Sequence, residues 1–417
     1  MAEERGPGVK AAQAAWLAAC AQAGCATSLP AEQVAIAEAV GRVTARPVHA
    51  RWSVPAHPVA AMDGIAVHAL DVGPDAGHPY RPVVLPPDRF DLIDTGDPLP
   101  AGRDTVVMRE HVQRRLDGAV EILTPTAAGR HVRAVGEDVR AGEPLLSAHH
   151  LLRPVDVATA ASAGHIELTV HARPLVAVIP TGDEIRPIGA DLARGEVLET
   201  NSLLLTGILH DAGCDVRTWA IQPDQPSRIA TAARDAATEA DLVLIIAGSS
   251  AGRGDHTAAV LRTLGEVIVH GVAVKPGHPV VLGVLHTERP VPVIGVPGYP
   301  ISAAMTVDLF ALPMLAGLHN RRPPRRPTIT ARVAVDLAPA DVERYLLVTV
   351  REPDRPDDPV PIADPSHRGA GALSALMRAD GLLLIAAGRQ HRAGDPVAIE
   401  LLRHPDPTRA PGRSSSG

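Results

Sequence analysis

The sequence predicts a multidomain protein in which an α/β domain with a mostly parallel sheet is combined with β-rich domains. Between Leu175 and Leu318, strand-like apolar runs alternate with helix-like runs. This alternation is typical of a parallel sheet covered by helices on both faces. From Val43 to His171 and from Ile329 to Leu402, short apolar runs are separated by Pro, Gly and Asp, as in β-rich domains. A chain of 417 residues is also too long for one compact core, so several domains are expected.

The N-terminal segment predicts two helices. The first covers the alanine-rich stretch from Val9 to Ala23 and ends at Gly24, a residue that commonly terminates helices. The second follows Pro30 and covers AEQVAIAEAVG, in which apolar residues recur at helical spacing.

The central segment supplies the alternating elements of the α/β domain. Strands are expected at PLVAVIP, CDVRTWAI, DLVLIIAG, EVIVHGVAV and PVIGVPG, and helices at NSLLLTGILHDAG, PSRIATAARDAATEA, DHTAAVLRTLG and PISAAMTVDLFALPML. The run HNRRPPRRPT after this segment is interpreted as a stiff, solvated linker rather than a nucleic-acid arm. The tail HPDPTRAPGRSSSG, residues 404–417, is expected to be disordered.

Composition excludes several classes of protein. The net charge is −7 and the basic residues are scattered, which argues against nucleic acid as a partner. No apolar run reaches about 18 residues and no signal segment begins the chain, so no membrane association is expected. Cys20, Cys25 and Cys214 lack the paired spacing of a zinc site and are expected to be buried, inert thiols. We therefore expect a reduced, soluble, cytoplasmic protein.

Three loops are predicted to line one crevice of the α/β domain. They are PTGDE at 180–184, AGSSAGRGD at 247–255 and GVPGYP at 295–300. Each follows an expected strand, and ligands of open parallel sheets bind outside the carboxyl ends of the strands. A phosphorylated ligand is expected there, because loop and helix N–H groups point to that edge.

The middle loop is the richest in potential phosphate contacts. Gly248, Gly252 and Gly254 can adopt conformations closed to other residues, and Ser249 and Ser250 add hydroxyl donors. Asp255 opens the next expected helix, where it could equally be a simple helix cap.

Charged residues next to the other loops suggest chemistry. The adjacent acids Asp183 and Glu184 favour a Mg²⁺ ion if they face a phosphate, although a charged surface turn is equally compatible. Lys275 in VKPGH could place an ammonium in the crevice, or could be an ordinary solvated lysine.

Two further acids lie in the β-rich region. Asp63 in AAMDGIAV precedes a glycine, which is also the signature of a hairpin turn. Asp138 in GEDVRAGEPLL has the same ambiguity. His57, His111 and His131 have no regular metal-ligand spacing and are interpreted as ordinary histidines.

Eight motifs, in order, resemble the molybdopterin molybdenumtransferase family, which includes MoeA and the gephyrin E domain. They are AMDGIAV, TGDPLPAG, GEDVRAGEPLL, VAVIPTGDEI, TNSLLL, GSSAGRGDHT, HGVAVKPG and GVPGYPISA. The match spans nearly the whole chain.

The resemblance implies four domains in each subunit of a homodimer. A split N-terminal domain would comprise 8–53 and 150–173, a β-rich insertion domain 54–149, and a three-layer α/β domain, similar to MoaB and MogA proteins, 174–320. A small C-terminal β-barrel would comprise 328–403.

The resemblance also implies an activity. Family members bind adenylylated molybdopterin and molybdate, insert the metal into the dithiolene, and release AMP in a magnesium-dependent hydrolysis. The implied active site lies between the α/β domain of one subunit and the insertion domain of the other.

Residues that match the family's motif positions, or border them, form the implied site. The implied catalytic residues are Asp63, Asp138, Glu184, Asp255 and Lys275, and the implied metal ligands are Asp63, Glu184 and Asp255. Substrate binding is expected at Thr95, Asp183, Asp224, Gly248, Ser249, Ser250, Gly252, Pro297, Pro300 and Ser302.

Several positions depart from the family's pattern. In the α/β domain, the family's GGVSVG is replaced by GSSAGRG, its KPGK by KPGH with His278, and its PGNP by PGYP with Tyr299. In the barrel, Leu347 stands where the family usually has an arginine, with Arg344 close by, and Ala370 lies where the family usually has a glycine-serine pair. Several of these fall in the half expected to hold molybdate. Two other functions therefore stay open: a carrier of the pterin cofactor without insertion activity, and a hydrolase acting on another nucleotide pyrophosphate.

Overall fold

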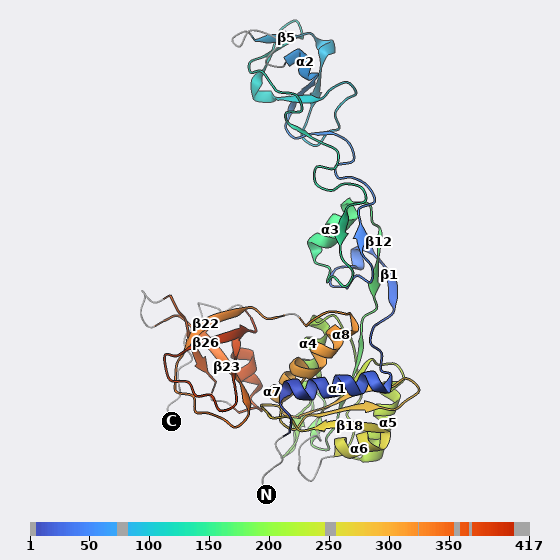
Figure 1. The fold of residues 1–417 in the computed structure, drawn as a ribbon, viewed down its shortest axis with the longest axis vertical. Coiled ribbons are helices and arrows are strands. Elements are labelled where there is room, and N and C mark those ends of the chain that lie inside the picture. The colour runs from blue at the N-terminus through green and yellow to red at the C-terminus, as the bar shows by residue number, and fades with distance from the viewer. Residues whose placement is uncertain are drawn as a thin grey trace. The chain divides into compact units, whose positions relative to one another are not determined.

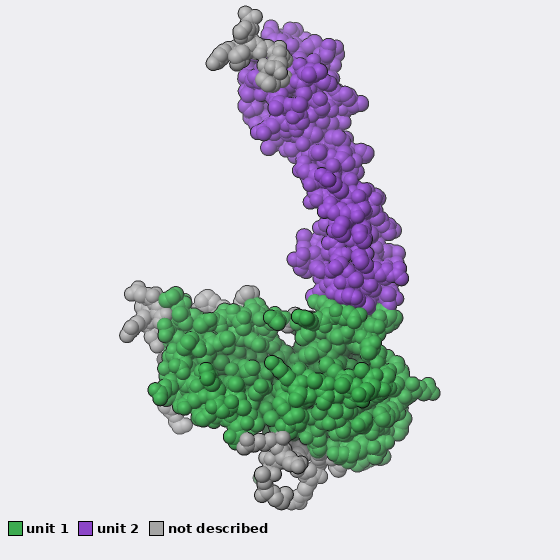
Figure 2. Space-filling view, in the orientation of Figure 1, with its two compact units in different colours: residues 1–30, 172–417 green, residues 31–171 purple. Residues whose placement is uncertain are grey.

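The computed structural model describes residues 6–72, 82–246, 256–323, 325–353, 359–366 and 369–403. Backbone contacts divide the chain into two compact units (Figure 2). Unit 1 comprises Met1–Pro30 and Ala172–Gly417, and unit 2 comprises Ala31–His171. The expected tail, 404–417, lies outside the described residues.

Unit 1 contains the predicted α/β domain around a six-stranded sheet of order β16-β13-β17-β21-β20-β18. The strands β16, β13, β17 and β21 run parallel to one another, whereas β20 pairs antiparallel with both β21 and the edge strand β18. The mostly parallel sheet is therefore confirmed. The bounds are β13 Leu175–Pro180, β16 Asp215–Thr218, β17 Leu242–Ile246, β18 Gly265–His270, β20 Val281–Leu285 and β21 Val291–Val296.

Helices cover both faces of this sheet, as alternating strand residues require. On β13, Val176 and Val178 pack towards one helical layer, while Ala177 and Ile179 pack towards the other. Because both faces are covered, the strands are apolar throughout rather than alternating. The first layer contains α1 Val9–Ala23, α4 Asn201–Asp211, α7 Pro300–Thr306 and α8 Leu312–Leu318; the second contains α5 Pro226–Ala237 and α6 His256–Leu264 (Figure 1).

Helix α1 forms as predicted and ends at Gly24, which adopts the left-handed conformation (φ 84°). It packs along β18 and β20, where the Nε1–H of the buried Trp16 donates to the carbonyl of Gly283 at 2.8 Å. Helix α1 thus packs in the core of unit 1. The expected domain boundaries, including 8–53, stay a prediction.

The second predicted helix, over 31–41, is wrong. Ala31–Ala35 form strand β1, which pairs antiparallel with β12, Glu167–His171, and only Ile36–Glu38 make a short 3₁₀ turn, η1. Helical spacing of the apolar residues was misleading, since the pairing partner lies more than a hundred residues away along the chain.

The last helical stretch of the α/β domain runs from Pro300 to Leu318 and includes a π-helical segment, η4, at Val307–Ala311. Pro313 in α8 lacks an N–H, and a π bulge is a usual way for a helix to absorb such a gap. These 19 residues are long and apolar enough to cross a membrane, but 67% of the stretch is buried, as in the core helix of a soluble protein.

The C-terminal region of unit 1 confirms the predicted small barrel. Five strands close on themselves in the order β23-β24-β22-β26-β25, because β25 also pairs with β23. The short strand β19 pairs in parallel with the first two residues of β23. The bounds are β19 Val274–Lys275, β22 Thr328–Val333, β23 Glu343–Arg351, β24 Ile362–Pro365, α9 Leu373–Arg378, β25 Gly381–Ile385 and β26 Pro396–Leu401.

Unit 2 is β-rich, as expected, and contains two main apolar clusters. One lies around β1, β12 and α3, Pro154–Ser162, and the other lies around the sheets β6-β4-β7 and β5-β9-β8. The bounds are β2 Val48–His49, β3 Val59–Ala60, β4 Gly64–Val67, α2 Ala69–Val72, β5 Val83–Leu85, η2 Pro87–Arg89, β6 Phe90–Ile93, β7 Thr105–Met108, η3 Arg109–His111, β8 Val112–Arg114, β9 Val120–Ile122, β10 Val132–Arg133 and β11 Pro144–Leu146.

The three cysteines are buried and free, as expected. Burial raises the pKa of the Cys214 thiol to about 12, so this thiol stays protonated and unreactive at neutral pH.

Candidate functional site

A pocket of about 850 Å³ opens at the carboxyl end of β21 in unit 1. The start of α4, the loop from β21 to α7, the short parallel pair β14 Ile185–Arg186 and β15 Val197–Leu198, and the segment before α9 surround it. Its wall is mainly apolar with a few polar groups, which is the usual character of a small-molecule site. The lining includes Glu184, Ile185, Val197, Leu198, Asn201, Pro279, Pro297, Tyr299, Pro300, Ser302, Gly371 and Leu373.

Four residues of the predicted site lie together in this pocket. Glu184 comes from the first predicted loop, while Pro297, Pro300 and Ser302 come from the third loop and the helix behind it. The structure thus brings two of the three expected loops to one cavity. The middle loop, with Gly248, Ser249, Ser250, Gly252 and Asp255, lies outside the described residues.

Hydrogen bonds fix the third loop at both ends. The Asn201 side-chain amide donates to the carbonyl of Gly298 at 2.7 Å, and the Ala303 N–H donates to the carbonyl of Tyr299 at 2.8 Å. The Ile301 N–H, at the start of α7, donates to the carbonyl of Ala370 at 3.1 Å. The loop is therefore held by α4 on one side and by the C-terminal segment on the other.

The first loop is equally constrained. Thr181 is buried and donates both its N–H and its hydroxyl to the carbonyl of Ile246 at 3.0 Å. Gly182 has φ 146°, and a Cβ there would lie 2.7 Å from the Ile185 side chain and 2.9 Å from Glu184 Oε2. Only glycine fits this turn, which presents Glu184 to the pocket.

Asp183 and Asp224 have a structural explanation that the sequence did not reveal. The Asp224 N–H donates to Asp183 Oδ1 at 3.1 Å, and the Asp183 N–H donates to Asp224 Oδ2 at 3.4 Å. The two carboxylates therefore tie the first loop to the loop that follows β16. Neither residue lines the pocket, so their predicted role in substrate binding stays a prediction.

Lys275 lies outside the pocket lining. It is exposed on β19, where it pairs in register with Arg344 of β23. Val274 beside it points into the core of the α/β domain, so the Lys275 side chain projects to the other side of the strand. His278, three residues further on, donates Nδ1–H to the carbonyl of Val272 at 2.7 Å and holds this loop together.

The barrel positions that depart from the family pattern are apolar here. Leu347 is buried in a cluster with Ile301, Met305 and Leu382. Arg344 cannot take the place of an arginine at 347, because the two residues lie on opposite faces of β23.

In unit 2, Asp63 lies in the turn between β3 and β4. Thr95 donates both its N–H and its hydroxyl to Asp63 Oδ1, each at 2.8 Å. The guanidinium of Arg109 lies 3.4 Å from Asp63 Oδ2 and 3.4 Å from Asp94 Oδ1. The pKa of Asp63 is lowered, first by the Thr95 N–H, then by the Thr95 hydroxyl and by the charge of Arg109. The predicted pair of Asp63 and Thr95 is therefore in direct contact.

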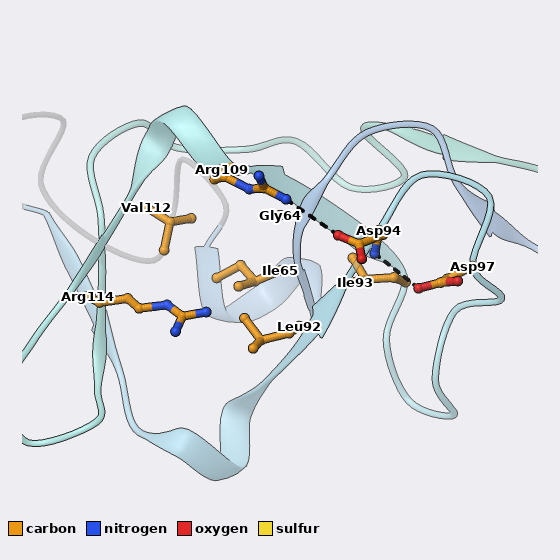
Figure 3. A pocket seen from close by; sticks show the side chains of 9 residues that line it. All are labelled: Gly64, Ile65, Leu92, Ile93, Asp94, Asp97, Arg109, Val112 and Arg114. Atoms are coloured by element: carbon orange, nitrogen blue, oxygen red, sulfur yellow. Dashed lines mark hydrogen bonds and ion pairs between the residues drawn. The ribbon is translucent and has the colours of Figure 1, made fainter.

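A tight backbone approach positions this turn. Gly64 pairs with Met108, and a Cβ on Gly64 would lie 2.0 Å from the carbonyl oxygen of Val107. The Arg109 N–H donates to the carbonyl of Asp63 at 3.0 Å. Beside the turn, a pocket of about 400 Å³ is lined by Ile65, Leu92, Ile93, Asp94, Arg109 and Arg114 among others; Figure 3 shows Arg109 joined to Asp94 there.

Asp138 is exposed, and its N–H donates to the carbonyl of Val54 at 3.0 Å. Within the described ranges, no hydrogen bond or ion pair reaches its carboxylate. His111 accepts or donates a bond with the Thr124 hydroxyl at 3.1 Å, and burial lowers the pKa of His131.

The described residues do not form a metal site by themselves. Across these ranges, no three His, Cys, Asp or Glu side chains lie close enough to hold an ion. Thr95 and Arg109 already contact the carboxylate of Asp63, the one expected ligand in unit 2. A complete Mg²⁺ site is therefore not built from Asp63 and Glu184 alone.

Two residues found at these positions were not expected there: Arg109, which contacts Asp63, and Tyr299, which lines the pocket. Nothing in the sequence indicated Arg109, since its contact with Asp63 depends on the pairing of β4 with β7. Tyr299 was noted only as a departure from the family's motif.

Comparisons with known proteins cover nearly the whole chain. Residues 8–164 match the MoeA N-terminal region (domains I and II), 177–317 a probable molybdopterin binding domain, and 330–402 the MoeA C-terminal region (domain IV). The chain is 28% identical over 384 residues to the molybdopterin molybdenumtransferase of Haemophilus influenzae, covering 89% of this chain and 94% of the relative.

Further relatives are similar over most of their length. A putative molybdopterin biosynthesis protein of Methanocaldococcus jannaschii is 30% identical, with 89% of this chain and 92% of the relative covered. The molybdopterin molybdenumtransferase of Synechococcus elongatus is 32% identical, with 70% and 76% covered. Among solved structures, the molybdopterin biosynthesis MoeA protein of Pyrococcus horikoshii superimposes with a TM-score of 0.78 and 27% identity, covering 95% of this chain and 99% of that one.

Proposed function

Because this chain belongs to the MoeA family of molybdopterin molybdenumtransferases, which are enzymes of molybdenum cofactor biosynthesis, we propose that its pocket at the carboxyl end of β21 binds adenylylated molybdopterin. One observation carries the proposal. Glu184, Pro297, Pro300 and Ser302, which match or border family motif positions, line a single cavity of about 850 Å³. A cavity of this size accommodates a small-molecule substrate.

The proposed reaction forms two bonds between molybdenum and the dithiolene sulfurs of the substrate, while one oxide ligand of molybdate leaves as water with the two thiol protons, and it releases AMP. The phosphoanhydride bond between the pterin phosphate and AMP breaks, and water supplies the oxygen and protons of the two phosphate products. Molybdate is a substrate in this scheme.

Asp63 is the residue of unit 2 best prepared for a part in this reaction. Its pKa is lowered, so it is ionised at neutral pH. A carboxylate with a low pKa is a weak general base, because efficient bases have a pKa near the working pH. We therefore assign Asp63 the task of accepting a hydrogen bond from the attacking water through Oδ2, while the two Thr95 donors hold Oδ1.

The location, the subunit arrangement, the further site residues and the metal in this proposal rest on the family resemblance. It implies a cytoplasmic homodimer in which the insertion domain of one subunit faces the α/β pocket of the other, with Lys275, Asp138, Asp183, Asp224 and the residues of the 247–255 loop contributing to the site. It also implies Mg²⁺. The described residues by themselves do not assemble an ion site.

A carrier function is the second candidate, and one observation favours it. The barrel position where the family has an arginine is a buried leucine, Leu347, and Arg344 faces away from it. A protein that bound the pterin but had lost an oxyanion contact would retain the cofactor without inserting metal.

Release of AMP decides between the two functions. Purified protein is mixed with adenylylated molybdopterin and Mg²⁺, with and without molybdate, and AMP is measured by chromatography. We expect AMP release that increases with molybdate and a product that activates a molybdoenzyme lacking its cofactor. Tight pterin binding without molybdate-dependent AMP would support the carrier instead, and absence of pterin binding would contradict both.

A further inference from the structure

We propose that Tyr299 is a specificity-determining residue whose ring stacks on a planar heteroaromatic ring of the ligand, either the pterin or the adenine, in the pocket at the carboxyl end of β21. The inference deepens the proposed function and rests on it for the identity of the ligand. It is carried by the placement, exposure and surroundings of this one side chain.

Tyr299 is unusual in this molecule because the chain contains only three Tyr, three Trp and two Phe residues. Within the described ranges, the large aromatic side chains that are mainly exposed are Tyr299, at 67%, and Trp52, at 53%. Trp52 has a structural explanation, since its Nε1–H donates to the carbonyl of Ser162 at 2.8 Å and its ring lies against Gly164. Tyr299 has no such anchoring bond, because its hydroxyl makes no hydrogen bond in the described part of the chain.

The backbone of Tyr299 is fixed, so its ring is presented from a rigid base. Pro300 follows it and restricts it to an extended conformation, which is observed at φ −75° and ψ 130°. The Tyr299 carbonyl accepts the N–H of Ala303, and the preceding carbonyl of Gly298 accepts the side-chain amide of Asn201. A backbone held in this way does not need to be ordered again when a ligand binds.

One edge of the Tyr299 ring packs against the protein backbone, and Tyr299 borders the pocket. A Cβ placed on Gly371 would lie 3.3 Å from Tyr299 Cδ1 and 3.5 Å from Cε1, so this edge of the ring lies against the glycine backbone. Tyr299 also lines the cavity together with Pro279, Pro297 and Leu198. Apolar proline and leucine side chains beside an exposed tyrosine form a surface that fits an aromatic ring better than a strongly hydrated group.

The chemistry of the ligand follows from these contacts. Stacking on an aromatic side chain depends on a π face and tolerates different bases, so it recognises a ring without reading its edges. The polar edges of a pterin or an adenine would have Glu184, Asn201 and Ser302 as potential partners in the same wall. Both rings occur in adenylylated molybdopterin, and the experiment distinguishes them.

The test measures ring binding with two simple probes, AMP and 6-hydroxymethylpterin, by calorimetry and, for the pterin, by its fluorescence. In Tyr299→Leu we expect binding of the stacked probe to weaken about 10-fold, with Tyr299→Phe within about 2-fold of the wild type. Leu203→Ala, an exposed change on α4 away from the cavity, is the control and should bind as the wild type does.

Each outcome is decisive. Weaker binding of the pterin alone assigns the pterin ring to Tyr299, and weaker binding of AMP alone assigns the adenine. Unchanged affinity of Tyr299→Leu for both probes, or binding of neither probe by the wild-type protein, overturns the proposal. If Tyr299→Leu weakens ring binding but the wild-type protein releases no AMP with molybdate, the proposed transferase activity fails while the role of Tyr299 stands.

Discussion

The pocket in unit 1 and the Asp63 turn in unit 2 are built in contrasting ways. The pocket lies at the edge of a fully covered sheet, and Pro297 and Ser302 in its wall are buried. The Asp63 turn joins strands of two and four residues, and side chains around it are exposed, with 47% for Asp63 and 68% for Arg109. The contrast is between a cavity with buried residues in its wall in unit 1 and an accessible, ionised carboxylate in unit 2.

The largest expected effect is a loss of stability on changing the packed core of unit 1. Trp16→Ala removes a side chain that is 1% exposed and bonded to Gly283, and should lower the free energy of unfolding by about 3–5 kcal/mol. Chemical denaturation followed by circular dichroism measures this loss. Leu17→Ala, a change at the neighbouring half-exposed position, should cost less than about 1 kcal/mol. Similar losses for the two variants would show that α1 is not part of the core of unit 1.

Replacing the accessible carboxylate of Asp63 in unit 2 should lower the activity without destabilising the fold. Asp63→Asn should reduce molybdate-dependent AMP release about 100-fold, because losing one hydrogen-bonding group positioned at the reacting atoms costs roughly that factor. The melting temperature should change little, since Asp63 is exposed and ion pairs at the surface contribute little stability. The exposed Asp88→Asn is the matched control. Normal turnover by Asp63→Asn would remove Asp63 from the site.

The buried acid Asp156 of unit 2 should sharpen the comparison, because it makes the stability of this unit depend on pH. Asp156 is 6% exposed, and its carboxylate accepts bonds from the Arg153 side chain, from His150 and from the Arg153 N–H. These contacts, chiefly the Arg153 side chain, hold the pKa of Asp156 well below its usual range. The stabilisation is therefore complete above the unfolded-state pKa of about 4, and is lost as the pH falls from there towards the folded-state pKa.

Asp156→Asn should accordingly destabilise the protein by about 1–2 kcal/mol at pH 7, with a smaller difference from the wild type in strong acid. Denaturant titrations at pH 7 and at about pH 3 compare the two proteins. A difference that is the same at both pH values would show that the charge of Asp156 does not contribute.

The smallest expected effect concerns the support behind Tyr299. Gly371→Ala places a methyl group 3.3 Å from the ring, which is tight enough to displace it slightly. We expect ring binding to weaken by about 2- to 5-fold, less than in Tyr299→Leu, because the ring is still present. Calorimetry with the probe that Tyr299 recognises measures the change, and Gly369→Ala, where a methyl group meets open space, should have no effect.

Most of the α/β domain could be predicted from the sequence because its strands and helices are continuous and strongly apolar. The strand at Leu242–Ile246 and the helix at Pro226–Ala237 are examples. The N-terminal helix at 31–41 was wrong since its residues instead pair with a distant strand, a contact that local spacing does not encode. The MoeA family could be recognised because many short motifs occur in order.

The candidate site was predictable in part for the same reason. The topology of a parallel sheet places the loops of Glu184 and Pro297 at one edge, and the structure confirms their meeting. The mutual contacts of Asp183 and Asp224, the ion pair of Arg109 and the packing of Leu347 arise from tertiary contacts instead. None of these had a signal in the residue types or in their spacing.

A crystal structure of the protein with adenylylated molybdopterin tests the central claim most directly. The account predicts that the ligand occupies the pocket at the carboxyl end of β21, with one of its rings against Tyr299 and polar contacts to Glu184 or Ser302. A fully occupied ligand elsewhere, for example in the pocket beside Arg114 of unit 2, with the β21 pocket empty, would contradict it.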